Sequence, residues 1–383
     1  MAELEVISWI DEGETRSALW RSERSAAPPT EMVVVDDRLT ADEAFGLAGQ
    51  NIGLLWRGDF QNARQLLNAL AARADQPPKK AKRRKELPAA PATMRDAFNL
   101  ERQARSRRAR MLAALLVPLE ADFSIPLRRT PDWRQACLEA YGPAEGLSVV
   151  SLRELLGVNS AHEWRKNGID VPALKGRIHP YYGVFAPIRS EYVDLVAQAP
   201  LPRGASLAFD IGTGTGVLAA VLARRGVQRV VATDMDPRAL ACAQENVTRL
   251  GLAAHVEVVN ADLFPEGRAP LIVCNPPWVP ARPSSPLEHG IYDAESRMLK
   301  GFLHGLAAHL EPAGEGWLLL SDLAEHLGLR SREELLAWID DGSLKVIDTA
   351  SMRPRHPRAT EATDPLHAAR NAERTSLWRL AAK

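Results

Sequence analysis

From residue 205 onward, short apolar runs alternate with longer segments in which apolar residues recur every three or four positions. The short runs predict strands, and the periodic segments predict helices. This alternation is typical of a parallel sheet that helices cover on both faces. Helices are expected at 217–225 and 237–250, and seven strands are expected at 206–210, 229–233, 255–260, 271–274, 316–321, 344–350 and 376–380.

The first 130 residues have a weaker pattern and contain no chemical motif. One strand is predicted there at 32–35, and helical spacing of apolar residues occurs at 41–48, 62–72 and 97–116. Short helices are also predicted after this part, at 133–140 and 152–156. We therefore expect three parts: an additional N-terminal α-rich region at 1–130, a helical lead-in at 131–200, and a main domain at 201–383.

The formal net charge is zero, with 48 basic and 48 acidic residues, but the charges are unevenly distributed. Residues 79–110 hold twelve basic and three acidic side chains, a net charge of +9. Prolines and small residues at 76–95 predict an exposed linker there. A charge run is most often a solvated surface, although it also suits nucleic-acid phosphates. A second basic cluster consists of Arg353, Arg355, His356 and Arg358.

Several classes of protein are disfavoured. Cys137, Cys242 and Cys274 lie far apart without metal-ligand spacing, so neither a disulfide framework nor a metal site is expected. No stretch approaches the roughly 20 apolar residues that cross a bilayer. The acidic amino terminus lacks the features of a secretory signal. A cytoplasmic protein without a membrane partner is the resulting expectation.

A glycine-rich loop at 210–216 joins the first predicted strand of the main domain to a helix. Gly212, Gly214 and Gly216 allow a sharp turn and a close approach to a ligand. Their Gly-x-Gly-x-Gly spacing differs from the dinucleotide fingerprint, which argues against a nicotinamide cofactor. A ligand-free turn fits an isolated triplet equally well, so the neighbouring motifs decide between the two interpretations.

Acidic residues follow the next two strands. Asp234 can accept hydrogen bonds from both ribose hydroxyls, whereas Asp236 suits a helix N-cap. Asp262 can accept a bond from an adenine amino group, with Leu263 or Phe264 over the ring. Ligands of open parallel sheets bind beyond the carboxyl ends of the strands, so these motifs together predict a nucleoside site.

Asn275-Pro276-Pro277-Trp278 follows the predicted strand at 271–274. The Asn275 side-chain oxygen and the Pro276 carbonyl can each accept an N–H bond from a planar nitrogen group. Pro276 and Pro277 restrict the turn that aims these acceptors. Trp278 offers a flat surface on which an amide or a base can stack. The alternative is a rigid turn with a core tryptophan.

These residues resemble the class I S-adenosylmethionine-dependent methyltransferases whose fourth strand ends in Asn-Pro-Pro and an aromatic residue. That branch includes the release-factor glutamine, ribosomal RNA guanine-N2 and adenine-N6 methyltransferases. The resemblance covers about 178–383, and 182–187 looks like the segment that closes over the methionine end of the cofactor. It implies a seven-stranded Rossmann-like α/β sheet and S-adenosyl-L-methionine as cofactor. The implied catalytic residues are Asn275, Pro276, Pro277 and Trp278.

The same resemblance bears on the methyl acceptor, on the catalytic groups and on the cofactor contacts. The aromatic residue of the turn is usually Tyr or Phe in that branch, so Trp278 departs from the pattern and leaves the acceptor open. Because the sulfonium is a strong methyl donor, alignment and preorganised acceptors should suffice, and no catalytic His or Glu is expected. The implied contacts are Phe185, Pro187, Asp210, Gly212, Thr213, Gly214, Gly216, Asp234, Met235, Asp262, Leu263 and Asn275.

Two methyl acceptors fit, an exocyclic amine of a nucleic-acid base and a protein glutamine amide. The expected partner is accordingly RNA or the ribosome, or a translation-related protein. A catalytic domain preceded by helices is similar to the release-factor enzymes, while the basic segment at 79–110 favours nucleic acid. A third hypothesis is a catalytically inactive scaffold of the same fold that binds RNA. The intact glycines and Asn275 count against it.

Overall fold

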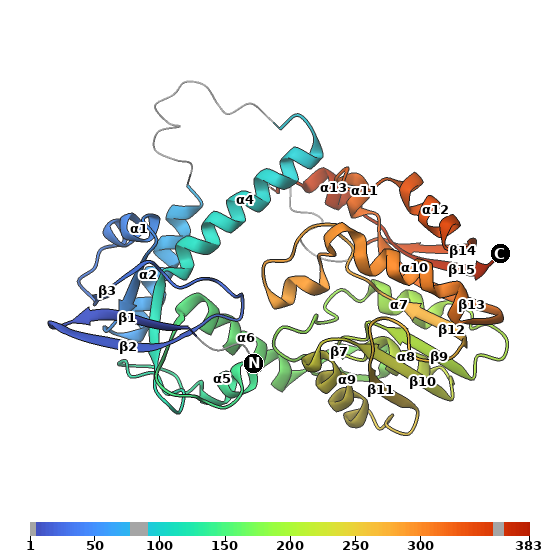
Figure 1. The fold of residues 1–383 in the computed structure, drawn as a ribbon, viewed down its shortest axis with the longest axis horizontal. Coiled ribbons are helices and arrows are strands. Elements are labelled where there is room, and N and C mark those ends of the chain that lie inside the picture. Colours follow the sequence, from blue (N-terminus) through green and yellow to red (C-terminus); the bar gives the residue numbers. More distant parts are fainter. Residues whose placement is uncertain (1–4, 77–90, 355–363) are drawn as a thin grey trace. The chain divides into compact units, whose positions relative to one another are not determined.

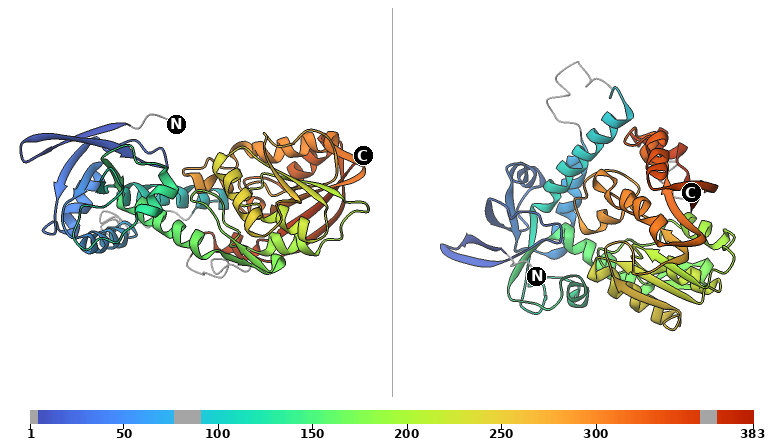
Figure 2. Two further views of the ribbon diagram at one scale, coloured as in Figure 1. Left: turned by 90° about the horizontal axis from the view of Figure 1, so that it is seen from below. Right: turned by 45° about the vertical axis from the view of Figure 1, so that its right-hand side comes forward.

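The computed structural model describes residues 5–76, 91–354 and 364–383 (Figures 1 and 2). The chain forms two compact units. The first unit comprises Met1–Ala92 and Asn99–Glu163, and the second comprises Thr93–Phe98 and Trp164–Lys383. The basic run at 79–85, most of the expected linker, and Arg355, His356 and Arg358 lie outside the described residues.

A six-stranded mixed sheet forms the centre of the first unit, in the order β1-β2-β6-β5-β4-β3. Strands β3, β4 and β5 are mutually parallel, and β6 is antiparallel to β5. The strands are β1 Val6–Asp11, β2 Glu14–Arg21, β3 Glu31–Val35, β4 Ile52–Trp56, β5 Leu115–Leu119 and β6 Ser148–Ser151. The helices are α1 Ala41–Gly49, α2 Phe60–Ala74, α4 Met94–Ala113, α5 Arg134–Tyr141 and α6 Leu152–Asn167, of which α4 and α6 run across the division between the units.

The first unit thus has a mixed sheet beside its helices and extends to Glu163, whereas an α-rich region ending at 130 was expected. Strand β5 is an apolar run that directly follows a helix, and the pattern alone merged it with that helix as 97–116. A buried strand of this kind cannot be told from a buried helical turn by periodicity. The division falls near residue 164 because β6 lies between β2 and β5 in the first sheet.

The second unit has the seven-stranded sheet that was expected, in the order β11-β10-β9-β12-β13-β15-β14. Strands β9 to β13 are parallel, whereas β15 is antiparallel to both of its neighbours. The strands are β9 Leu207–Ile211, β10 Arg229–Asp234, β11 Val256–Asn260, β12 Ala269–Cys274, β13 Leu310–Ser321, β14 Leu344–Met352 and β15 Thr375–Ala382, with a separate small pair, β7 Ile169–Val171 and β8 Gly176–Ile178.

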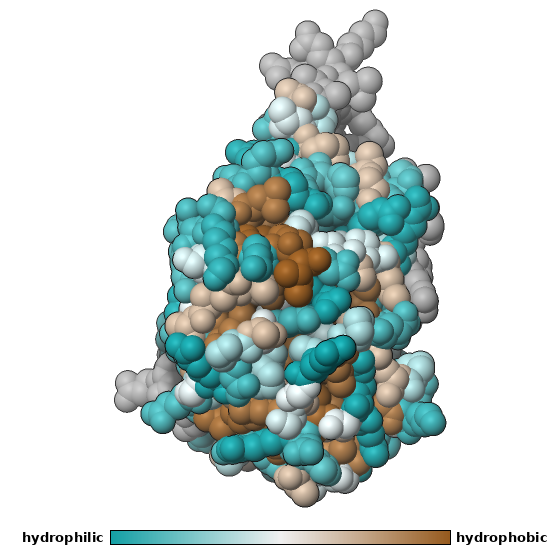
Figure 3. Space-filling model, turned by 90° about the vertical axis from the view of Figure 1, so that its right-hand side faces the viewer, coloured by the Kyte–Doolittle hydropathy of each residue, from teal (hydrophilic) through white to brown (hydrophobic). Residues whose placement is uncertain are grey.

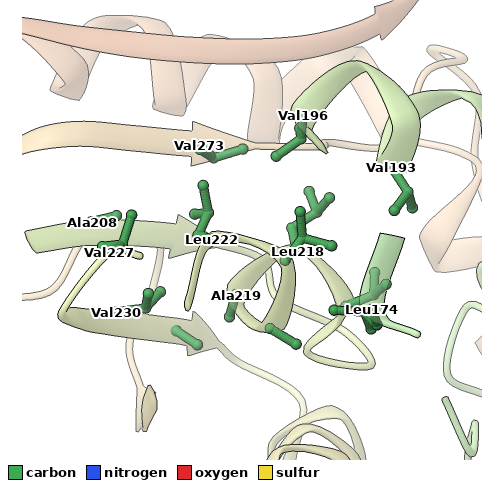
Figure 4. Close-up of a cluster of buried hydrophobic side chains, with 14 of the residues drawn as sticks. Leu174, Val193, Val196, Ala208, Leu218, Ala219, Leu222, Val227, Val230 and Val273 are labelled. Atoms are coloured by element: carbon green, nitrogen blue, oxygen red, sulfur yellow. The ribbon is translucent and has the colours of Figure 1, made fainter. Parts of the chain in front are cut away.

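Helices cover both faces of this sheet, because alternate residues of each central strand point to opposite sides. Ala208 belongs to one cluster with Leu218 of α8 (Figure 4), whereas its neighbour Phe209 belongs to another with Leu299 and Phe302 of α10. The helices are α7 Glu191–Gln198, α8 Val217–Arg224, α9 Pro237–Arg249, α10 Arg297–His309, α11 Leu323–His326, α12 Arg332–Asp341 and α13 His367–Ala372, with 3-10 turns η1 Pro172–Leu174, η2 Pro286–Gly290 and η3 Ala294–Ser296.

Strand β14 forms one edge of the second sheet, and all its residues from 345 to 351 are exposed. Figure 3 shows the side of the molecule that carries α12 and β14, where apolar patches lie among polar surface. The large exposed apolar residues of these two elements are Leu336, Val346 and Ile347. Among the described helices, none is both long and apolar enough to span a membrane.

Candidate active site

The glycine-rich loop follows β9, and its three glycines have φ angles of 71°, 55° and 79°, in the left-handed region that favours glycine. They serve different purposes. A methyl group at Gly212 would collide with the side chain of Met298, while one at Gly214 would meet open space. At Gly216 it would lie 3.2 Å from Ala243 of α9, so this glycine permits close packing of helices instead of ligand contact.

Asp210 lies beneath the loop and is 1% exposed. Its Oδ2 accepts hydrogen bonds from Thr213 Oγ1 at 2.6 Å and from the Ala219 amide at 3.0 Å. The pKa of Asp210 is raised to about 6, first by burial and also by the nearby Asp234 carboxylate, although the two hydrogen bonds favour the charged form. Asp210 therefore stabilises the conformation of the loop through these hydrogen bonds.

The Asp234 carboxylate links the loop to the end of β10 through a hydrogen bond. Its Oδ2 accepts the Gly214 amide and its Oδ1 accepts the Asp236 amide, both at 3.0 Å. Each carboxylate oxygen can accept a second bond, which leaves capacity for a ribose hydroxyl. Asp236 accepts the Arg238 amide at 2.9 Å, so the N-cap predicted for α9 is confirmed.

The end of β11 contributes the next part of the site. Leu263 has a φ of +71°, and its carbonyl accepts a 2.6 Å bond from Thr233 Oγ1. Phe264 points elsewhere, because it stacks on the His309 ring with centroids 4.3 Å apart. Of the two residues considered for covering an adenine ring, only Leu263 lines the central cavity.

These strand ends surround one cavity of about 400 Å³, within the size range of small-molecule sites. The glycine loop and Asn275 both line this cavity, so the two main motifs border the same space. Pro187, Asp210 and Gly216, which were also expected as contacts, are not among its lining residues. The expected contacts that do line it are Phe185, Gly212, Thr213, Gly214, Asp234, Met235, Asp262, Leu263 and Asn275.

Residues of the segment before α10 and of the first turns of α10 form a wall of the cavity that the sequence did not reveal. Gly290 belongs to it, since a methyl group there would lie 2.6 Å from Phe185 Cβ, and Arg297 donates a 3.2 Å bond to Asp262. Glu295 and Ser296 have φ angles of 59° and 55°, a left-handed conformation that side chains rarely adopt and that is often found at functional sites. The lining residues that were missed include Tyr192, His289, Gly290, Arg297, Met298 and Gly301.

The turn at residues 275–278 differs from its expected arrangement. Asn275 Oδ1 accepts a 2.9 Å bond from Trp278 Nε1. The Trp278 ring meets Tyr192 edge to face, and the Arg189 guanidinium carbon lies 4.9 Å from the ring centroid. Pro277 and Asn275 line the cavity, whereas Pro276 and Trp278 do not. The structure therefore does not place Trp278 as an open surface for stacking a substrate.

The first unit has a wider hollow of about 560 Å³, lined by residues of β3, α1 and the loop between them. Asp36 and Arg38 in that loop bond to each other, with 2.8 Å between Arg38 Nη2 and Asp36 Oδ2. None of the chemical motifs lies there, so the cavity of the second unit is the better candidate site.

Comparisons with known proteins agree with this assignment. Residues 197–276, which contain the glycine loop and end just after Asn275, match the family model described as ribosomal protein L11 methyltransferase (PrmA). A ribosomal protein L11 methyltransferase of Pelotomaculum thermopropionicum is 48% identical over 75 residues, 19% of this chain and 24% of that protein. A release factor glutamine methyltransferase of Cereibacter sphaeroides is 35% identical over 132 residues, 30% of this chain and 47% of that protein.

The chain thus spans less than half of each of these two relatives. Among solved structures, the ribosomal protein L11 methylase of Lactobacillus delbrueckii subsp. bulgaricus is 18% identical. The similarity covers 50% of this chain and 77% of that one, with a TM-score of 0.33.

Asp234→Ala should weaken binding of S-adenosylmethionine by about 1.5 to 3 kcal/mol, because bonds from ribose to a charged acceptor would be lost and the Gly214 amide released. Titration calorimetry measures this change. Glu257→Ala, which removes an exposed carboxylate paired with Arg229 on the neighbouring strand, is the matched control and should bind normally. Equal affinities for the two variants would place the ribose contact elsewhere.

Asp210 should make the protein less stable as the pH rises from about 4 to about 6. Its folded pKa is raised above the ordinary 3.8, so the stabilisation it gives at low pH is lost as the pH rises through that folded value. Asp210→Asn keeps an oxygen acceptor and cannot ionise. The free energy of unfolding of Asp210→Asn, relative to that of the wild type, should therefore rise by up to about 3 kcal/mol across this interval. Urea unfolding at several pH values tests this, and a constant difference between the two proteins would contradict it.

Proposed function

We propose that the second unit, which is a class I S-adenosylmethionine-dependent methyltransferase domain, methylates a planar side-chain nitrogen of a protein, with a glutamine amide as the preferred acceptor. The observation that carries this proposal is the shared cavity, in which the glycine loop and Asn275 line one space. A methyl donor held by the loop would therefore meet an acceptor held by Asn275.

The residues of the cavity fit the cofactor. Gly214 leaves open space at the loop, Asp234 retains acceptor capacity for ribose, and Leu263 offers an apolar surface beside Asp262. Asp262 accepts a bond from Arg297, and its second oxygen can accept from an adenine amino group. When bound, S-adenosylmethionine supplies a reactive methyl group on a positively charged sulfur.

Asn275 supplies what a weakly nucleophilic amide needs. One acceptor site of its Oδ1 is taken by Trp278, and the other can accept an N–H of the incoming amide. That bond orients the nitrogen and shifts electron density onto it, so that its lone pair can be directed at the methyl carbon. Correct alignment of reacting groups is worth several kcal/mol of the barrier in enzymes. Once methylated, the nitrogen carries a positive charge and its acidic proton passes to water, so no His or Glu is assigned as a general base.

A protein acceptor is favoured by the names of the relatives, which describe methyltransferases of ribosomal protein L11 and of release factors. A nucleic-acid base is the second candidate, and one observation favours it. Helix α4 is exposed from residue 103 to 107 and carries six arginines against two acidic residues. Two of these arginines are already paired, Arg105 with Glu101 and Arg108 with Asp75, which reduces the charge available to phosphates.

Labelling distinguishes the candidates. The protein is incubated with tritiated S-adenosylmethionine and a lysate of the source organism, and the products are divided between ribonuclease and protease. We expect the label to survive ribonuclease and to become soluble after protease. The reverse result would establish the nucleic-acid acceptor, and the absence of any label together with no cofactor binding would leave only a scaffold.

Asn275→Ala should lower the rate of methyl transfer about 100-fold or more, the usual effect of losing one preorganised polar contact to the reacting group. Affinity for S-adenosylmethionine should stay within a few-fold, since the other cavity contacts remain. The control is Asn260→Ala, which changes an exposed asparagine at the end of β11 outside the cavity. Near wild-type turnover by Asn275→Ala would refute its role as acceptor.

A further inference from the structure

The side chain of Trp278 makes contacts that a substrate platform would not need. Its Nε1 donates to Asn275 Oδ1 at 2.9 Å, and its ring contacts both Tyr192, at a centroid distance of 6.5 Å, and the Arg189 guanidinium. Trp278 also contributes to three hydrophobic clusters of the second unit. The ring is thus held in place from several directions.

The bond to Asn275 determines which way the asparagine amide faces. An asparagine side chain has an oxygen that accepts and a nitrogen that donates, and the two exchange places by a half-turn of the amide. The indole nitrogen can only donate, so it selects the orientation in which Oδ1 lies toward it. In the opposite orientation, an N–H group of Asn275 would face the nitrogen that receives the methyl group. The N–H groups of that nitrogen would then lack a hydrogen-bond acceptor.

Arg189 is itself fixed by a buried polar network. It donates to Glu191 Oε1 at 2.6 Å and to Glu373 Oε1 at 2.9 Å, and these carboxylates are nearly completely buried. Glu373 also accepts a 2.6 Å bond from Ser321, the last residue of β13. The network therefore connects the cation above the Trp278 ring to the strand ends that frame the site.

We infer that Trp278 is a positioning residue, which fixes the Asn275 amide as a hydrogen-bond acceptor for the incoming nitrogen, and that Arg189 holds the indole ring in place. This inference rests on the proposed methyl transfer. A Phe or Tyr ring at this position would carry no N–H.

Two replacements isolate the indole N–H. Trp278→Phe removes it with part of the ring, and replacement of Trp278 by 3-benzothienylalanine substitutes sulfur for the N–H while keeping the ring shape. Initial rates of tritium transfer are measured over a series of lysate concentrations. We expect the maximal rate to fall about fivefold to tenfold in both variants, the effect of one lost hydrogen bond. The half-saturating lysate concentration, the cofactor affinity and the melting temperature of the benzothienyl variant should stay unchanged.

Trp338→Phe is the matched control, because Lys300 lies over that ring at 4.6 Å and Trp338 does not line the cavity. It should keep the wild-type rate. An unchanged maximal rate in both Trp278 variants would overturn the positioning role. So would a raised half-saturating concentration at an unchanged rate, which is the result for a stacking platform. A wild-type protein that transfers no label would instead refute the proposed function itself.

Discussion

Two carboxylates determine the shape of the glycine loop, and the candidate site depends on that shape. Asp210 holds the loop from below through Thr213 and Ala219, and Asp234 holds it from the side through the Gly214 amide. The two negative charges oppose each other, which contributes to the raised pKa of Asp210. The loop can therefore present backbone and open space to a ligand while its own polar groups stay satisfied.

The turn that carries Asn275 is the second element of the site, and it lines the same cavity as the loop. Asn275 is bonded to Trp278, and the cation over the indole ring is held by buried glutamates at the ends of neighbouring elements. Neither element would be useful alone, because a donor and an acceptor must meet within a few tenths of an ångström of the productive geometry. The parallel sheet brings them together, since β9 and β12 are adjacent and end at the same edge.

The features that the sequence predicted correctly are those with local signals. The seven strands of the second unit are marked by apolar runs, and the α9 cap is marked by Asp236 next to a proline. The strands of the first unit were missed where a buried strand resembles a helix in pattern, as in β5.

The details of the site that were missed depend on tertiary contacts. That Gly216 packs on Ala243, that Trp278 bonds back to Asn275, and that residues 289–301 form a wall are consequences of how distant segments meet. Residue type and spacing carry no information about such contacts. The roles of the lining residues as cofactor contacts accordingly remain predictions.

A crystal structure of the protein with sinefungin, an analogue that carries an amine in place of the transferable methyl, tests the central claim most directly. We predict that its adenosine part lies along the glycine loop and Asp234, and that its amine points toward Asn275. Binding of the analogue anywhere else, or with its amine turned away from Asn275, would contradict the account.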